Sequence, residues 1–190
     1  MRRILSFLLT LTLLIGCMLS ITGCDLEFLK KDEKKKSEPE IECPEGYKFY
    51  KNDDLAFAYP AGWSLQDGSI TILIDEITSD NITVVYESKT DMYDDMTLGK
   101  FNELILPVYE AMGTKVKNVQ FYEGSTNGLD VIKITYDASA YGVSMYQTIY
   151  IVDIGERTYT VTVTEMQKNS ELSQVVFNTL HTVATETEED

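Results

Sequence analysis

The feature that most constrains the fold is a series of four β-like segments separated by short turn sequences. The segments are Lys117–Tyr122, Leu129–Tyr136, Val143–Val152 and Thr158–Thr164, all rich in β-branched and aromatic residues. Two of the connecting sequences, Gly124–Gly128 and Asp153–Glu156, contain the Gly, Asn and Asp residues that hairpin turns require. This half of the chain is therefore predicted to form an antiparallel meander.

Shorter strand patterns precede the meander, and helical patterns flank it. The strand patterns are Gly46–Tyr50, Leu55–Tyr59, Ser69–Asp75 and Ile82–Ser88. Thr97–Met112 has apolar residues at helical spacing, and Pro107 within it predicts a kink or a shorter helix. A final helix would begin at Asn169 or Ser170, with an apolar stripe of Leu172, Val175, Val176, Leu180 and Val183. The chain is thus predicted to be an α+β protein, with an antiparallel sheet of about six to seven strands sandwiched with helices.

The first 24 residues have the pattern of a secretory signal. Met1-Arg2-Arg3 is basic, residues 4–21 are apolar and uncharged, and small residues precede Cys24. A cysteine directly after Gly23 makes the segment resemble a bacterial lipoprotein signal. The resemblance implies cleavage between Gly23 and Cys24 and attachment of acyl chains, such as palmitate, to Cys24. A diacylglyceryl cysteine carries two chains, which suffices for stable membrane anchoring.

Two other interpretations of this segment stay open. Its length, about 18 apolar residues, is near the minimum for a membrane-spanning helix, so an uncleaved anchor is an alternative. Leu14–Cys17 is a second lipobox-like string, but cleavage there would leave the largely apolar stretch Met18–Gly23 at the start of the mature chain. Because Cys24 borders the charged region, we favour Cys24.

Four regions follow from this interpretation. Residues 1–23 are the signal peptide, and residues 24–45 are a lipidated tether that is too charged and too poor in large apolar residues to fold. Residues 46–184 form one domain, long enough for a single core, and residues 185–190 are an acidic tail. Cys43 lies in the tether without an intramolecular partner, so it is a spare thiol or forms an intermolecular disulfide.

The charge of the chain restricts its partners. Its formal net charge is −15, and removal of residues 1–23 takes away Arg2 and Arg3, which leaves 14 basic residues against 31 acidic ones, or −17. So acidic a surface argues against nucleic-acid binding and against docking of the whole domain onto anionic lipid. Membrane contact is therefore expected through the lipid on Cys24.

The sequence LAFAYPAGW at residues 55–63 carries a family resemblance. It is followed by a strand, DNITVVYES, an amphipathic helix, a meander and a C-terminal helix, and this order resembles the PsbP/Mog-like superfamily. That family opens on a strand ending in Pro-x-Gly-Trp, here Pro60 to Trp63. The resemblance covers residues 46–184 and implies an α+β sandwich with a binding or assembly role.

The individual residues of this motif have expected structural roles. Pro60 would fix a turn after Tyr59, and Gly62 would permit the bend. Trp63 is the only tryptophan of the chain, and we expect it to pack against the sheet or a helix as a core plug.

The sequence contains no catalytic or metal-binding motif. Its one histidine, His181, has no Ser or Cys partner motif, so we expect a structural role near the end of the final helix. Asp91, Asp94 and Asp95 offer oxygen ligands, but they lack the alternation and glycine of a calcium loop and also suit a helix N-terminus. We expect no enzyme activity, no cofactor and no metal.

Two functions remain as hypotheses. The first is a membrane-anchored extracytoplasmic lipoprotein that acts as a non-enzymatic binding or envelope-assembly module with a protein partner. The alternative is a small-ligand or glycan receptor, suggested by twelve tyrosines. Five of them lie in or beside predicted strands, where cross-strand packing is the favoured explanation: Tyr136, Tyr141, Tyr146, Tyr150 and Tyr159. A hydrolase would require two carboxylates in a cleft.

Overall fold

The computed structural model describes residues 41–66, 68, 70–89, 93, 96–168 and 170–183. The strands are β1 (Tyr47–Lys51), β2 (Leu55–Pro60), β3 (Ser64–Gln66), β4 (Thr71–Ile74), β5 (Asn81–Ser88), β6 (Lys115–Thr126), β7 (Leu129–Ala140), β8 (Val143–Ile154), β9 (Arg157–Glu165) and β10 (His181–Thr182). The helices are α2 (Leu98–Leu104), α3 (Leu106–Ala111) and α4 (Ser170–Thr179).

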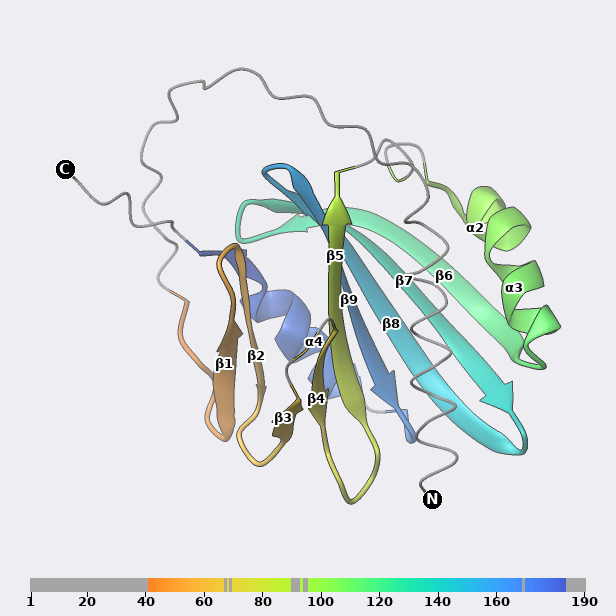
Figure 1. The fold of residues 1–190 in the computed structure, drawn as a ribbon, viewed down its shortest axis with the longest axis horizontal. Coiled ribbons are helices and arrows are strands. Elements are labelled where there is room, and N and C mark those ends of the chain that lie inside the picture. The colour runs from red at the N-terminus through yellow and green to blue at the C-terminus, as the bar shows by residue number, and fades with distance from the viewer. Residues whose placement is uncertain are drawn as a thin grey trace.

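These strands form two antiparallel sheets (Figure 1). The larger sheet has seven strands in the order β3-β4-β5-β9-β8-β7-β6, and the smaller has the order β1-β2-β10. The predicted meander is confirmed as β6 to β9, joined by tight turns. At the β6–β7 turn, Asn127 and Gly128 have φ angles of 48° and 80°, the left-handed conformation that an Asn-Gly hairpin turn needs.

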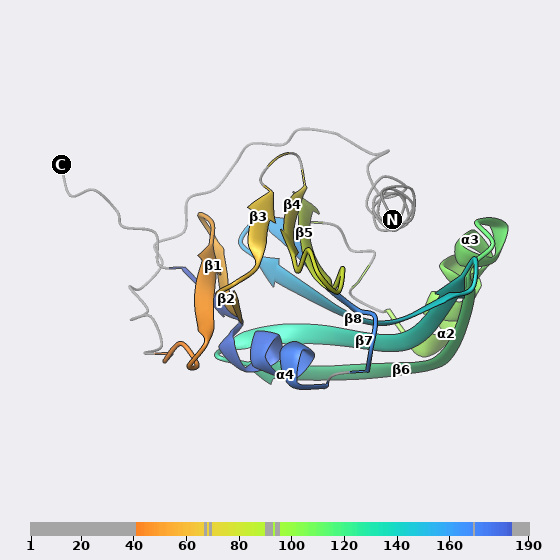
Figure 2. The same ribbon diagram turned by 90° about the horizontal axis from the view of Figure 1, so that it is seen from below.

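Helices cover the large sheet on both faces, because successive side chains of a strand point to opposite sides. Leu129 and Val131 of β7 join a core cluster with β2 and α4, whereas Ile134 and Tyr136 of the same strand join a second cluster with α2 and α3. Figure 2 shows α4 beside the β1–β2 hairpin and α2–α3 at the opposite end of the molecule. The predicted sandwich of sheet and helices is confirmed.

The helix predicted over residues 97–112 is two short helices. Thr97 caps α2, its hydroxyl accepting a hydrogen bond from the Lys100 N–H, and α2 gives way to α3 at Ile105. Pro107 lies in the first turn of α3, where its missing N–H costs nothing. Phe101 and Tyr109 still face the sheet from the two pieces, so the break preserves the apolar face.

One short strand was not predicted, and two predicted boundaries were wrong. The strand β3 is too short to give a periodic signal, and β6 continues through Gly124 to Thr126, so the turn is shorter than predicted. The final helix ends at Thr179, which places both Leu180 and Val183 beyond the helix. His181, expected in a structural role near the helix end, lies just beyond it and pairs with Ala56 of β2, and the N–H at its Nδ1 donates to the Thr179 carbonyl at 2.6 Å. No helix among the described residues is long and apolar enough to cross a membrane.

Candidate functional site

Two loops meet at the end of the molecule where β2 stops (lower end of Figure 1). In the β2–β3 loop, the Trp63 N–H donates to the Pro60 carbonyl at 3.1 Å, which closes the turn, and the Ala61 N–H donates to the Gly46 carbonyl at 2.9 Å. The hydroxyl of Ser64 at the start of β3 donates to Glu76 Oε1 at 2.8 Å, which ties this loop to the β4–β5 turn. The β2–β3 loop, with Pro60 to Trp63, and the β4–β5 turn, residues 75–80, therefore form one edge of the domain, which we call the two-loop edge.

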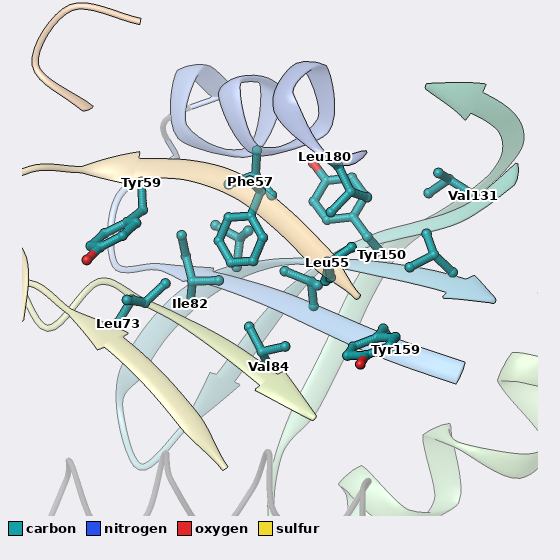
Figure 3. Close-up of a cluster of buried hydrophobic side chains, with 14 of the residues drawn as sticks. Leu55, Phe57, Tyr59, Leu73, Ile82, Val84, Val131, Tyr150, Tyr159 and Leu180 are labelled. Carbon is teal, nitrogen blue, oxygen red and sulfur yellow. The ribbon is translucent and has the colours of Figure 1, made fainter. Parts of the chain in front are cut away.

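The motif residues differ in burial. Tyr59 is buried in the core cluster that β2 forms with the large sheet and α4. The Lys48 ammonium lies over its ring, 5.0 Å from the ring centroid. Trp63 is only half-buried and packs against the margin of that cluster. The fully buried aromatic side chain of the motif strand is Phe57 (Figure 3).

The β4–β5 turn, residues 75–80, is held by its own side chains. Asp75 Oδ1 accepts from the Ile77 N–H at 2.9 Å, and Asp75 Oδ2 accepts from the Thr78 hydroxyl at 3.1 Å. The Ser79 N–H donates to the Asp75 carbonyl at 2.8 Å, with Ser79 at a φ of 70°. Such side chain-to-backbone bonds fix a turn. At its tip, the side chain of Ile77 is 93% exposed.

A buried carboxyl group lies beside this turn. Glu165 ends β9 and is 4% exposed, and its Oε1 atom has no hydrogen-bond partner among the residues that the structure describes. The backbone N–H of Met166 donates to Asp80 Oδ1 at 2.7 Å, so Asp80 sits against the end of β9. Burial, and then the charge of Asp80, raises the pKa of Glu165 to about 7.

A second polar cluster lies at the opposite end of the sheet and joins the two sheets. Asp54, in the β1–β2 turn, accepts from Tyr159 Oη at 2.6 Å and pairs with Arg157 Nη1 at 2.8 Å. Burial and the hydrogen bond to Asp54 raise the pKa of Tyr159 to about 12, so its hydroxyl stays a donor. Lys89 and Asp153 form a further pair at 3.2 Å. These charges neutralise one another in the fold.

Replacing Asp54 with alanine is expected to lower the free energy of unfolding by about 1–3 kcal/mol, because the buried Tyr159 hydroxyl loses its acceptor. Urea denaturation followed by circular dichroism measures the change. Asp53→Ala, at the exposed neighbouring position, is the matched control and should change stability by less than about 0.5 kcal/mol. Equal effects of the two substitutions would show that the cluster does not hold the sheets together.

Comparison with solved structures identifies the architecture. The solution structure of cyanobacterial PsbP (CyanoP) from Synechocystis sp. PCC 6803 matches with a TM-score of 0.58 and 15% identity, over 76% of this chain and 99% of that one. The domain has the PsbP-like fold. At this identity the likeness concerns the fold alone, and the fold inferred from the YPAGW motif is confirmed.

Further matches to the PsbP-like domain are weaker. A crystal structure from Bacteroides thetaiotaomicron VPI-5482 has a TM-score of 0.45 at 13% identity, over 72% of this chain and 47% of that chain. LpqN, described as involved in cell envelope biogenesis of Mycobacterium tuberculosis, has a TM-score of 0.42 at 10% identity, over 68% of this chain and 83% of that chain. No protein-family model and no curated protein matches the sequence.

The structure describes some of the other residues singled out in the sequence. Of the five strand tyrosines, Tyr136, Tyr150 and Tyr159 are buried, and Tyr141 is 78% exposed at the β7–β8 turn. Cys43 is exposed. Gly23, Cys24, Asp91, Asp94 and Asp95 lie outside the described residues, and within the described part no cluster of three or more His, Cys, Asp or Glu side chains is arranged for a metal ion.

Sequence reasoning missed the residues at the two-loop edge of the PsbP-like domain. The signal for Ile77 was present, because the sequence DEITSD places one large aliphatic residue among acids between two strands. The signal for Glu165 was also present. It follows Val161 and Val163 at the period of two that marks the core face of β9, so a carboxyl group was due to point inward there.

Proposed function

We propose that this chain is a lipid-anchored extracytoplasmic protein whose PsbP-like domain is a non-enzymatic binding or envelope-assembly module. The observation that carries the proposal is the β4–β5 turn, which presents the exposed side chain of Ile77 from a backbone fixed by Asp75. A binding surface gains from such order, because little conformational freedom is lost when a partner docks.

The chemistry at the two ends of the sheet also supports a binding role. At one end Asp54, Arg157 and Tyr159 satisfy one another, and this arrangement serves to join the two sheets. At the other end the exposed Ile77 lies between Glu76 and Thr78, in a turn fixed by the Asp75 carboxylate. Protein-binding surfaces combine an apolar centre with a polar rim, and Ile77 among these polar groups is compatible with that arrangement.

The anchor rests on the signal-like N-terminus and its cysteine. Cys24→Ser is expected to abolish metabolic labelling of the protein by a fatty-acid analogue and to move the protein from the membrane fraction to the soluble fraction. Cys17→Ser is the matched control and should leave labelling unchanged. Labelling that survives Cys24→Ser and is lost with Cys17→Ser would place the anchor at Cys17 and contradict the assignment.

The binding role is tested by chemical cross-linking of intact membranes from cells that make the protein at its native level. A binding module should yield the same protein adduct in repeated experiments, and the adduct should disappear when Cys24→Ser releases the protein from the membrane. A chain that stays anchored and yields no reproducible adduct would contradict a binding or assembly role.

A further inference from the structure

The two-loop edge gathers acidic side chains from three parts of the fold. Asp75, Glu76 and Asp80 come from the β4–β5 turn, Glu165 from the end of β9 and Glu171 from the first turn of α4. We call Asp75, Glu76, Asp80 and Glu171 the acidic edge, and Glu165 is the buried carboxyl group beside Asp80. Burial and then the charge of Asp80 raise the pKa of Glu165, and burial followed by the charges of Glu171 and Glu165 raises the pKa of Tyr47 in β1.

Among the described residues, burial and then the negative charge of Asp80 raise the pKa of Glu165, and no cation lowers it. Asp80 faces it from the β4–β5 turn, and two tyrosines, Tyr47 of β1 and Tyr150 of β8, interact with its charge. Lys168, three residues further along the chain, points its ammonium at the Tyr146 ring, 5.8 Å from the ring centroid. Glu165 is therefore a buried carboxyl group that faces an acid and two phenols.

The unpartnered oxygen of Glu165 is evidence independent of the acid cluster itself. Buried polar atoms in folded proteins nearly always have a hydrogen-bond partner, so each exception calls for an explanation. Glu165 Oε1 is such an exception. Its side chain lies beside Asp80, and the Asp80 carboxylate accepts a hydrogen bond from the Met166 N–H. A positive charge docked against Asp80 would lower the repulsion between these two carboxyl groups.

The exposed side chain of Ile77 favours an occupant with apolar surface over a simple ion. Its side chain stands in solvent at the tip of the same turn, between Glu76 and Thr78, and the Asp75 carboxylate fixes the backbone beneath it. Burial of a whole isoleucine side chain stabilises a complex substantially, so an occupant with apolar surface gains from this contact. The edge thus combines an aliphatic anchor with a negative rim.

We propose that the acidic edge docks a lysine- or arginine-bearing segment of a partner protein, with Ile77 inserted between apolar side chains of that segment. The inference rests on the proposed function and deepens it by naming the chemistry of the partner. The cations of the partner face Asp80 and Glu76, and the docked positive charge favours the ionised form of Glu165, so binding releases a proton.

Binding can be measured with the full chain in phosphatidylcholine nanodiscs and a short fluorescent peptide of alternating lysine and leucine, with empty nanodiscs subtracted. Peptides of alternating lysine and serine, and of glutamate and leucine, are the controls. The lysine–leucine peptide should bind at least about tenfold more tightly than either control. Equal affinity of the lysine–serine peptide would reduce the interaction to non-specific charge attraction and overturn the proposal.

Variants locate the binding. Ile77→Ser should weaken binding of the lysine–leucine peptide about tenfold, whereas Tyr122→Ser, at a 54% exposed position on the opposite edge strand β6, should not change it. Both positions are exposed, and circular dichroism confirms that each variant is folded. Unchanged affinity after Ile77→Ser would overturn the proposal, and loss of affinity after Tyr122→Ser would place the site at β6.

Glu165→Gln tests the part played by the buried carboxyl group. Well above the pKa of about 7 the variant should bind the lysine–leucine peptide several-fold more weakly than the wild type, and well below it the two should bind equally. Equal binding of the peptide by wild type and variant at both pH values would show that the Glu165 carboxyl group takes no part in binding. If the peptide fails to bind while membrane cross-linking still yields a reproducible adduct, this inference falls and the proposed function stands.

Discussion

Replacing Phe57 with alanine is expected to lower the free energy of unfolding by about 3–5 kcal/mol, the usual cost of removing a buried phenylalanine side chain. Phe57 is fully buried in the cluster formed by β2, the large sheet and α4 (Figure 3). Its ring lies 5.1 Å from that of Tyr50, centroid to centroid. The substitution therefore removes apolar burial and leaves a cavity at the contact between the two sheets.

The matched control for Phe57→Ala is Trp63→Ala. Complete burial of Trp63 in the core would give its truncation the same cost, about 3–5 kcal/mol. Because Trp63 is half-buried at the margin of the cluster, we expect roughly half of that cost, about 2 kcal/mol. Urea denaturation of both variants compares them directly. An equal or larger loss for Trp63→Ala would show that the tryptophan is the core plug after all.

Glu165→Gln is expected to change how stability depends on pH. Burial and Asp80 raise the folded-state pKa of Glu165 to about 7, so the folded chain holds its proton more tightly than the unfolded chain does. The stabilisation from this proton is fully present below about pH 4.5 and is lost as the pH rises through about 7. The wild type should lose about 2–3 kcal/mol over that interval at this residue, and the variant should not.

The measurement is the difference in unfolding free energy between wild type and Glu165→Gln across the same pH interval. The difference should move in favour of the variant as the pH rises. Gln120→Ala, at an exposed position on β6 that carries no titratable group, is the control and should give a difference that does not vary with pH. A flat difference for Glu165→Gln would mean that the Glu165 carboxyl group has an ordinary pKa in the folded protein.

Local chemistry explains which parts of the fold were predictable. The meander of β6 to β9 follows from runs of β-branched residues and from turn sequences such as Asn127-Gly128, whose conformation is set by those residues themselves. The break between α2 and α3 follows from Pro107 in the same way. The fold inferred from the YPAGW motif is borne out by the likeness to cyanobacterial PsbP.

The remaining features depend on contacts between distant segments. The strands β3 and β10 are two or three residues long, so partners elsewhere in the chain decide their pairing and local pattern does not. The same holds for the acidic edge, where Asp80 meets the end of β9 across 86 residues of sequence. Its charge pattern could be read from the sequence, but its assembly into one surface could not.

The most direct test of a membrane-anchored binding module is photo-cross-linking from the acidic edge in intact cells. A photoreactive amino acid at position 77 should form a covalent adduct with one protein partner, and Glu76→Lys should diminish that adduct. The same photoreactive amino acid at positions 122 and 141, which are also exposed, should give no comparable adduct. Absence of an adduct from position 77, together with absence from positions 122 and 141, would contradict the account.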